Sequence, residues 1–520
     1  MPIVSNWAGT ISYNASQVKR PGQLRDVRAE ILAGLAANRK MRALGSRFSF
    51  SFSIKEPDIV FDLSELNDLR VFTREAAATA PLQAGAFSDP RVAGYAYAGA
   101  GVIIDEACRG LKEHGLAPFT LGGSSGQTII GAAMTSTHGG DFDEFPLPEY
   151  VVGLHLLTGG DKDVWIERRL AGGAYTSDAD VAELTDVSPA NLTIFRDDEL
   201  FDAVIVSLGC AGVVVGVLIK ARKSTVLNER MLSRVPWSTV KAALENGSAF
   251  ATLPGELDAG PGGTYRYLEV ILNPYMSPAE AFVVGRNELP AGTPTSPWEP
   301  RKPPDMGRFA LDFGLNVSSS SAAFTTLIDG TRLTGRANGR WQYFAYADLI
   351  NVGVPAFVPV YSYELCWPAD HVGSNGQLSY LWLMDRCIEL VSQGLGRAQA
   401  FTGTITLRFC RGTSAHLGMQ YSADPGARRF AHVEISPLQS FSQQNHELEP
   451  ANQRFIDAVM ASPPAQSARL HWGQGSRPSK RHDARRSLMH STWQARLREL
   501  LGPRAGAFTN EFCERVHASF

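Results

Sequence analysis

The stretches Arg42-Ala43-Leu44-Gly45-Ser46-Arg47-Phe48-Ser49-Phe50 and Leu121-Gly122-Gly123-Ser124-Ser125-Gly126 decide how this chain folds. Each is a glycine-rich turn that also carries serine hydroxyls. Glycine lets backbone N–H groups approach a pyrophosphate closely, and the hydroxyls add further donors. Two turns of this kind predict a cradle that holds a long dinucleotide from both sides.

Composition limits the class of protein. The chain has 520 residues, of which 44% are hydrophobic and 19% charged, so it is long enough for two or more cores. A formal net charge of −3 gives no electrostatic footprint for nucleic acid, so the expected partner is a small molecule. The N-terminus has no leader pattern and no apolar run reaches spanning length, so we expect a cytoplasmic location without a membrane span.

The six cysteines are scattered along the chain without CxxC spacing. Their spacing predicts neither a zinc or other metal site nor a disulfide framework. Most lie in apolar runs, so we interpret them as small buried hydrophobic residues. They are Cys108, Cys210, Cys366, Cys387, Cys410 and Cys513.

The first part of the chain alternates short strands and helices. Periodicity and turn residues predict helices over residues 20–38 and 103–114, and strands over residues 41–44, 58–63, 151–158, 164–166 and 212–221. After Lys223 the pattern changes. Strands are predicted over residues 265–272, 357–365, 403–409, 416–421 and 430–435, with helices over residues 378–394 and 450–461.

This second pattern predicts an α+β cap with an antiparallel sheet. The proline-rich stretch from Leu289 to Met306 is predicted to be a surface excursion, because strands resume on both sides of it. The expected domains are residues 1–224, residues 225–470 as the cap, and residues 471–520, which return to the first domain.

Several segments, in this order, resemble the FAD-binding proteins related to vanillyl-alcohol oxidase and p-cresol methylhydroxylase. The nearest branch is that of the alditol and aldonolactone oxidases. The segments that carry the resemblance are residues 42–46, 62–64, 132–139, 206–214 and His471-Trp472-Gly473. The resemblance implies an α+β fold, with a two-part FAD-binding domain of the vanillyl-alcohol oxidase type and an α+β substrate cap.

The resemblance also implies which residues meet the FAD. The two turns would bind its pyrophosphate, and the segment around His138 would pass near the isoalloxazine. His138 is either a ligand-facing group or an ordinary hydrogen-bonded loop residue. The expected cofactor-binding residues are Leu44, Gly45, Ser46, Arg47, Phe48, Ser49, Gly122, Gly123, Ser124, Ser125, Gly126, Ser136, His138, Gly139, Gly212, Val213 and His471.

Three positions depart from the pattern of these relatives. Phe48 stands where many of them carry a histidine that bonds covalently to the flavin, so we expect noncovalent FAD. Thr406 stands in place of the glutamate of a Glu-x-Arg motif, and Gln474 in place of a lysine. Thr406 and Gln474 are therefore the expected substrate-contacting residues.

The candidate catalytic residues lie on two predicted strands. Side chains alternate along a strand, so Arg408 shares a face with Thr406, and His432 shares a face with Glu434. An antiparallel sheet that joins these faces would bring the four groups together. Arg408 would then stabilise negative charge on the reduced flavin, and either His432 or Glu434 would be the base.

The sequence thus predicts an FAD-dependent oxidoreductase that takes a hydride from an alcohol, lactol or amine carbon, with O2 as the expected acceptor. The loss of the polyol-contacting Glu and Lys predicts a substrate bulkier than a simple alditol. The alternative is a degenerate flavin-fold protein that binds a ligand or partner without redox turnover. The three departures at Phe48, Thr406 and Gln474 motivate that alternative.

Overall fold

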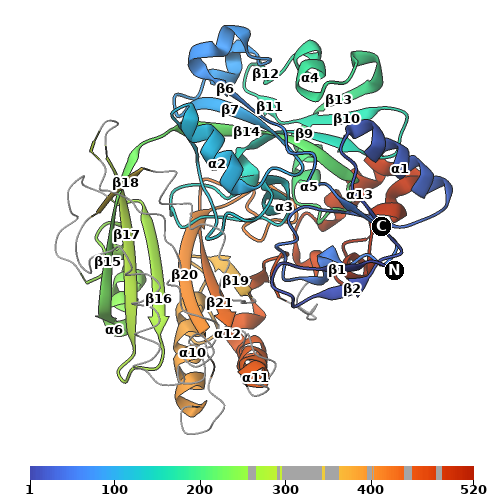
Figure 1. The fold of residues 1–520 in the computed structure, drawn as a ribbon. Coiled ribbons are helices and arrows are strands. Elements are labelled where there is room, and N and C mark those ends of the chain that lie inside the picture. Colours follow the sequence, from blue (N-terminus) through green and yellow to red (C-terminus); the bar gives the residue numbers. More distant parts are fainter. Residues whose placement is uncertain are drawn as a thin grey trace, which may run out of the picture.

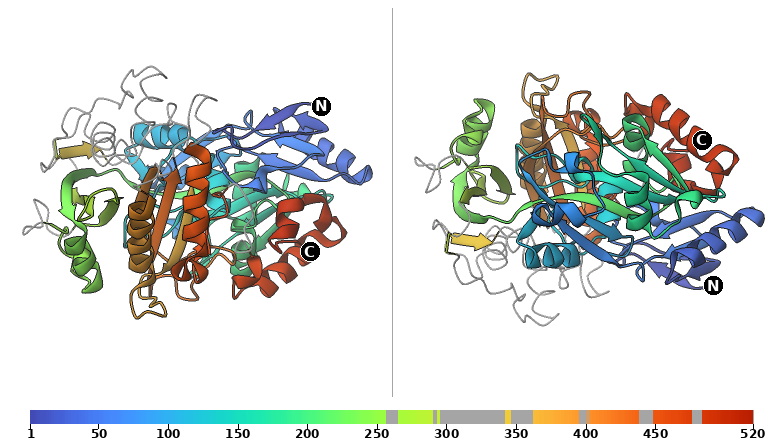
Figure 2. Two further views of the ribbon diagram at one scale, coloured as in Figure 1. Left: turned by 90° about the horizontal axis from the view of Figure 1, so that it is seen from below. Right: turned by 90° about the horizontal axis from the view of Figure 1, so that it is seen from above.

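The cap sheet stands beside the N-terminal region, and the two termini lie on the same side of the molecule (Figures 1 and 2). The structure, a computed structural model, describes residues 1–255, 265–289, 293–294, 342–345, 362–394, 401, 403–437, 448–475 and 483–519. The expected proline-rich excursion lies almost wholly outside the described residues.

The N-terminal region contains two main sheets. A small parallel sheet has the order β3-β5-β4, and a larger mixed sheet has the order β13-β10-β9-β14-β7-β6, with β8 beside β14. The strands are β1 (Ile3–Ser5), β2 (Ser12–Asn14), β3 (Gln17–Lys19), β4 (Met41–Leu44), β5 (Ile59–Asp62), β6 (Leu69–Thr73), β7 (Val92–Gly99), β8 (Leu116–Pro118), β9 (Val151–Leu157), β10 (Asp163–Glu167), β11 (Arg169–Leu170), β12 (Gly173–Ala174), β13 (Leu192–Arg196) and β14 (Val213–Lys223).

Helices pack around these sheets. They are α1 (Leu24–Ala36), α2 (Ile104–Glu113), α3 (Ile129–Met134), α4 (Asp178–Thr185), α5 (Asp198–Ile205), α13 (His490–Leu501) and α14 (Glu511–Arg515). The last two come from the C-terminal segment. Trp493 and Phe512 share one apolar core with Val27 and Ile205.

All strand pairs of the cap sheet are antiparallel, with the order β18-β15-β17-β16-β20-β21-β19-β22. Leu381 and Met384 of α10 belong to the same apolar core as Leu407 and Val433 of the sheet. The elements are β15 (Val226–Pro236), α6 (Trp237–Glu245), β16 (Tyr267–Asn273), β17 (Glu280–Leu289), β18 (Gln342–Ala345), β19 (Tyr363–Pro368), α10 (Ser379–Gly394), β20 (Gly403–Arg411), β21 (Arg429–Pro437), α11 (Leu448–Ala461), α12 (Pro463–Gln466) and β22 (Arg469–Leu470).

The α+β class with an antiparallel cap sheet is confirmed, and one predicted strand is wrong. Residues 416–421 form successive turns, with a single isolated bridge between Thr413 and Tyr421. Their alternation of apolar side chains has another cause. Leu417 packs into the core of the N-terminal region, and the Leu417 carbonyl accepts a hydrogen bond from Trp472 Nε1 at 2.7 Å.

No helix among the described residues combines the length and the apolar character that a membrane span requires.

Candidate functional site

A cavity of about 410 Å³ lies between the glycine-rich turns and the cap sheet. The turn after β4 and the turn before α3 form one wall. Strands β16, β19, β20 and β21 supply the other wall. The two walls approach each other closely, because a Cβ added to Gly123 would lie 3.6 Å from Arg408 Nη1.

Most of the predicted site residues line this cavity. They are Leu44, Gly45, Ser46, Arg47, Phe48, Ser49, Gly122, Gly123, Ser124, His138, Gly212, Thr406, Arg408, Glu434, His471 and Gln474. The remaining predicted residues do not lie on the wall; they are Ser125, Gly126, Ser136, Gly139, Val213 and His432. Ser136 instead donates its hydroxyl to Gln420 Oε1 at 2.6 Å, away from the cavity.

The first turn fits tightly against the start of α3. A Cβ on Gly45 would lie 2.2 Å from Thr128 Oγ1, so no larger residue fits there without movement. Thr128 is the N-cap of α3 and accepts a hydrogen bond from the Gly131 N–H at 3.2 Å. The glycine therefore lets the turn pack onto the start of this helix.

Phe48 is held in an aromatic stack. Its ring lies on that of Trp7, with centroids 4.7 Å apart and an interplanar angle of 18°. On its other side it packs against Gly126, where an added Cβ would lie 2.3 Å from the Phe48 ring. The absence of a side chain at Gly126 leaves room for the Phe48 ring, so this glycine packs against Phe48 and does not line the cavity.

Sheet register brings the polar side chains of the cap wall together. Arg408 of β20 lies directly opposite Glu269 of β16 and His432 of β21. In the next row, Glu434 lies opposite Thr406 on one side and Glu364 on the other. Direct partners in antiparallel strands share a face, so these groups gather on the cavity side of the sheet.

Arg408 and Glu434 form a salt bridge on this wall. Glu434 Oε1 also accepts hydrogen bonds from Ser362 Oγ at 2.7 Å and Gln474 Nε2 at 3.3 Å. Burial alone would lower the pKa of Arg408, but nearby glutamates, Glu434 first, raise it, so the guanidinium stays charged. The carboxylate that the resemblance places at position 406 is therefore supplied by the neighbouring strand.

A second buried pair joins the two walls. His138 Nε2 lies 2.5 Å from Glu364 Oε1, and His138 Nδ1 lies 2.7 Å from the Gly139 carbonyl. Burial opposes ionisation of Glu364, but His138, followed by His432, holds the pKa of this carboxyl well below its usual range. Both ring nitrogens of His138 therefore face hydrogen-bond acceptors, one on the cap sheet and one in its own loop.

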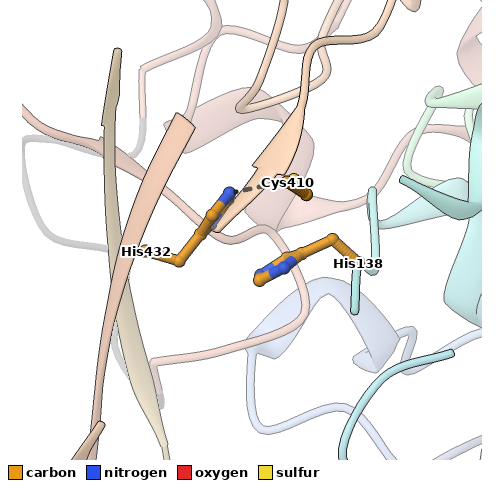
Figure 3. A group of neighbouring side chains, drawn as sticks. All are labelled: His138, Cys410 and His432. Atoms are coloured by element: carbon orange, nitrogen blue, oxygen red, sulfur yellow. Dashed lines mark hydrogen bonds between the residues drawn. The ribbon is translucent and has the colours of Figure 1, made fainter. Parts of the chain in front are cut away.

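His432 lies behind His138, and the two rings stack with centroids 3.6 Å apart (Figure 3). Burial, with His138 next in effect, lowers the pKa of His432 to about 3, so this ring is neutral. Its Nε2 lies 3.3 Å from Cys410 Sγ and its Nδ1 lies 3.4 Å from Glu364 Oε1. His432 therefore does not line the cavity itself, but it contacts His138 and Glu364, which do.

The ligand-type atoms of His138, Cys410 and His432 lie within 4.8 Å of one another, a spacing that suits a metal ion (Figure 3). The ring geometry does not suit one. Stacked rings direct their nitrogen lone pairs along nearly parallel planes, away from a common point. Burial also raises the pKa of the Cys410 thiol well above its usual value, which opposes a thiolate ligand. We interpret the group as a hydrogen-bonded cluster.

Sequence reasoning missed two carboxylates of the cap wall, Glu269 and Glu364, and the aromatic partner Trp7. A signal for Glu364 was present, because Ser362 and Glu364 alternate on one face of the predicted strand over residues 357–365. Its partner His138 lies 226 residues away in sequence, so no local pattern joins the two.

Comparison with known proteins identifies part of the chain. Residues 15–165 match a family of FAD binding domains. An alditol oxidase of Streptomyces sp. (strain IKD472 / FERM P-14339) is 30% identical over 178 residues, which is 34% of this chain and 38% of the relative. A D-arabinono-1,4-lactone oxidase of Yarrowia lipolytica (strain CLIB 122 / E 150) is 24% identical over 293 residues, which is 56% of this chain and 45% of the relative. The chain therefore matches less than half the length of either relative.

Solved structures match over almost the whole chain. A cholesterol oxidase from B. sterolicum has a TM-score of 0.66 at 15% identity, covering 99% of this chain and 96% of that one. A solvent-stable cholesterol oxidase has a TM-score of 0.67 at 14% identity, covering 99% and 97%. At such identities the likeness shows the fold: an FAD-binding domain combined with an antiparallel cap sheet.

The cavity wall fits FAD. Gly45, Gly122, Gly209 and Gly212 line it, and added Cβ atoms at Gly45 and Gly212 would collide with Thr128 Oγ1 at 2.2 Å and the Leu157 carbonyl at 2.8 Å. Arg47 of the first turn also lines the cavity, and its positive charge suits an anionic pyrophosphate. On the same wall, the buried oxygens Gln127 Oε1 and Gln474 Oε1 have no hydrogen-bond partner among the described residues. Such acceptors suit the N–H and O–H groups that FAD carries.

Proposed function

We propose that the protein is an FAD-dependent oxidoreductase that oxidises an alcohol, lactol or amine carbon, with O2 as the electron acceptor. The observation that carries the proposal is the pairing of two walls around one cavity. One wall belongs to the segment that matches FAD binding domains, and the other presents the Arg408–Glu434 pair.

The turns around Gly45 and Gly122 would hold the pyrophosphate of FAD, and His138 and Arg408 would border its reactive end. When bound, FAD supplies the acceptor for the substrate hydride. We further propose that the FAD is noncovalent. Phe48 offers no nucleophile, and the described lining of the cavity includes no cysteine.

Glu434 is the proposed proton acceptor for the substrate hydroxyl. Its carboxylate lines the cavity, and the salt bridge to Arg408 fixes it in position. Ser362 and Gln474 fix the orientation of Oε1, the oxygen that would receive the proton. His432 was the other candidate from the sequence, but it is buried behind His138, so its role is to position that ring.

The cap wall also supports a proposal on the substrate. Thr404, Ser436 and Ser362 line the cavity beside Glu434 and present hydroxyl groups to a hydroxyl-bearing substrate. Gln474 is uncharged where the resemblance places a lysine, which removes a cation that would hold a small polyol. The proposed substrate is therefore bulkier than a simple alditol and presents one hydroxyl-bearing carbon to the polar wall.

Anaerobic mixing with a panel of substrates tests this function. The flavin absorbance at about 450 nm should bleach with a bulky alcohol, lactol or amine, and admitting O2 should restore it. Xylitol serves as the comparison compound, and a higher kcat/KM for xylitol than for the bulkier compounds would refute the substrate proposal. Protein that takes up FAD but is bleached by no compound of the panel supports the binding protein without redox turnover.

A further inference from the structure

Cys210 and Cys513 form a buried pair that joins two distant segments. Their Sγ atoms lie 3.1 Å apart, although the residues are 303 positions apart in sequence. Cys210 lies in the turn after α5, and Cys513 lies in α14 of the C-terminal segment. Both side chains are fully buried.

The turn that carries Cys210 also borders the cavity. Leu208 and Gly209 line the wall directly before Cys210, and Gly212 lines it two residues later. Leu208 has a φ of 56°, in the left-handed region that non-glycine residues rarely adopt, so this turn is held in a strained shape. Anything that fixes Cys210 therefore fixes a part of the cavity wall.

The guanidinium of Arg42 contacts this pair. It donates hydrogen bonds to the Leu208 carbonyl and, at 3.9 Å, to Cys513 Sγ. Among the described residues, no carboxylate forms an ion pair with Arg42, although the side chain is almost fully buried. A buried cation without a carboxylate partner favours a negative charge nearby, and the Cys513 thiol is the acidic group at hand.

The hydrogen bonds make one sulfur the donor and the other the acceptor. Cys210 Sγ donates to Cys513 Sγ and lies 3.5 Å from the Ala518 carbonyl, so Cys210 carries the proton. The hydrogen bond from Cys210 lowers the pKa of Cys513 to about 6; burial opposes this shift and Arg42 adds to it. The same hydrogen bond, with burial, raises the pKa of Cys210 well above its usual value. The contact with Arg42 and the hydrogen bond from Cys210 thus both favour the thiolate form of Cys513, with Cys210 as its hydrogen-bond donor.

We propose that Cys210 and Cys513 are an oxidisable pair that a peroxide converts into a disulfide, tying the cavity turn to α14. The Cys513 thiolate attacks one oxygen of hydrogen peroxide; an S–O bond forms, the O–O bond breaks, and the hydroxide that leaves takes up the proton that Cys513 had released to the solvent. Cys210 sulfur then attacks Cys513 sulfur; the S–S bond forms, the S–O bond breaks, and the departing oxygen leaves as water with the Cys210 proton. The two thiols lose two electrons, and one peroxide becomes two waters.

Peptide mapping of the full-length wild-type protein tests this pair. The protein is treated with hydrogen peroxide, the excess is removed with catalase, and free thiols are alkylated in denaturant before digestion without reductant. The expected product is the Cys210 peptide linked to the Cys513 peptide, with two hydrogens lost. The other four cysteines are buried free thiols as well, so they are internal controls, and they should be recovered alkylated.

Three other outcomes would overturn the proposal. Six alkylated thiols after peroxide treatment, or a Cys513 sulfinic or sulfonic acid without the cross-link, would show that the pair does not close. A Cys513 that reacts no faster than the buried Cys108 and Cys387 would show that Arg42 confers no reactivity. Because peroxide is added as a reagent, failure here leaves the proposed oxidase function standing.

Two variants separate the roles of the residues. Cys210→Ser removes the resolving thiol, so dimedone should trap a sulfenic acid on Cys513. Arg42→Met removes the charge at similar size and should slow the loss of the Cys513 thiol by about tenfold or more at pH 7. A dimedone adduct absent from Cys513 in the first variant, or an unchanged rate in the second, would contradict the assigned roles. The wild-type map stands if either variant fails to fold.

Discussion

At the scale of single residues, the site keeps a carboxylate–guanidinium pair although the sequence lacks Glu-x-Arg. Thr406 and Glu434 are direct cross-strand partners, so a carboxylate moved from β20 to β21 still reaches Arg408. This pairing explains why the departure at Thr406 does not remove the acidic group from the wall.

Glu434→Gln tests the role of this carboxylate. Glutamine keeps the shape of the side chain and one acceptor oxygen but cannot accept a proton, so kcat should fall by about 10²- to 10⁴-fold while FAD uptake is unchanged. Steady-state rates and an FAD titration measure the two effects. Glu434→Asp is the matched control and should retain part of the activity, because it restores the charge on a shorter side chain. Full turnover in Glu434→Gln would assign the proton to another group.

The sequence was enough to place Thr406 and Arg408 on one face of a strand, but not to find Glu364 as the partner of His138. Period-two alternation is a local property, so Thr406 and Arg408 could be placed on one face without a structure. Glu364 meets His138 only because β19 pairs with β21 in one register, and that register is set by the packing of the whole sheet.

At the scale of elements, the cofactor wall depends on the contact between the first turn and the start of α3. Thr128 caps this helix and at the same time fills the space that a side chain at position 45 would need. The cradle and the helix are thus parts of one packed unit.

Gly45→Ala tests this contact. The added Cβ would collide with Thr128, and overpacking of this kind typically costs about 1–3 kcal/mol, so the affinity for FAD should fall by about tenfold or more. Fluorescence titration of apoprotein with FAD measures the change. Gly173→Ala is the matched control, because a Cβ at that position meets nothing within 4 Å, and it should bind FAD like the wild type. Equal affinities in the two variants would mean that the cradle does not depend on this contact.

Two long strands of the cap, β15 and β17, gave no clear signal in the sequence. Their buried positions include polar residues that satisfy one another across the pair. Arg286 donates to Glu229 Oε2 at 2.7 Å, and Asn228 Oδ1 accepts from the Asn287 N–H at 3.1 Å. Buried polar pairs of this kind hide the apolar alternation on which strand prediction relies.

At the scale of the whole molecule, buried neutral histidines link stability to pH. Burial lowers the pKa of His416 and of His471 to about 4, and that of His432 to about 3. In the unfolded chain these rings protonate near pH 6.5. The unfolded state therefore binds more protons between pH 6.5 and about 4, and the free energy of unfolding falls as the pH falls through this window.

The variant His416→Gln removes the contribution of one histidine to the pH dependence of stability. His416 lies outside the cavity wall, so the change should not disturb the site. Each such histidine contributes a slope of about 1.4 kcal/mol per pH unit, so the variant should lose stability less steeply than the wild type between pH 6.5 and pH 4. Asp202 acts in the opposite sense in both proteins, because burial raises its pKa to about 6. Urea unfolding at a series of pH values gives the two slopes, and parallel slopes would contradict the assignment of His416 as neutral.

The central claim is that this fold binds FAD in the cavity and holds it without a covalent bond. The most direct measurement is acid precipitation of the yellow, FAD-saturated protein, followed by fluorescence of the pellet and the supernatant. We expect flavin in the supernatant, one per chain, because Phe48 cannot form a covalent bond to it. Flavin that stays in the pellet, or protein that takes up no added FAD, would contradict it.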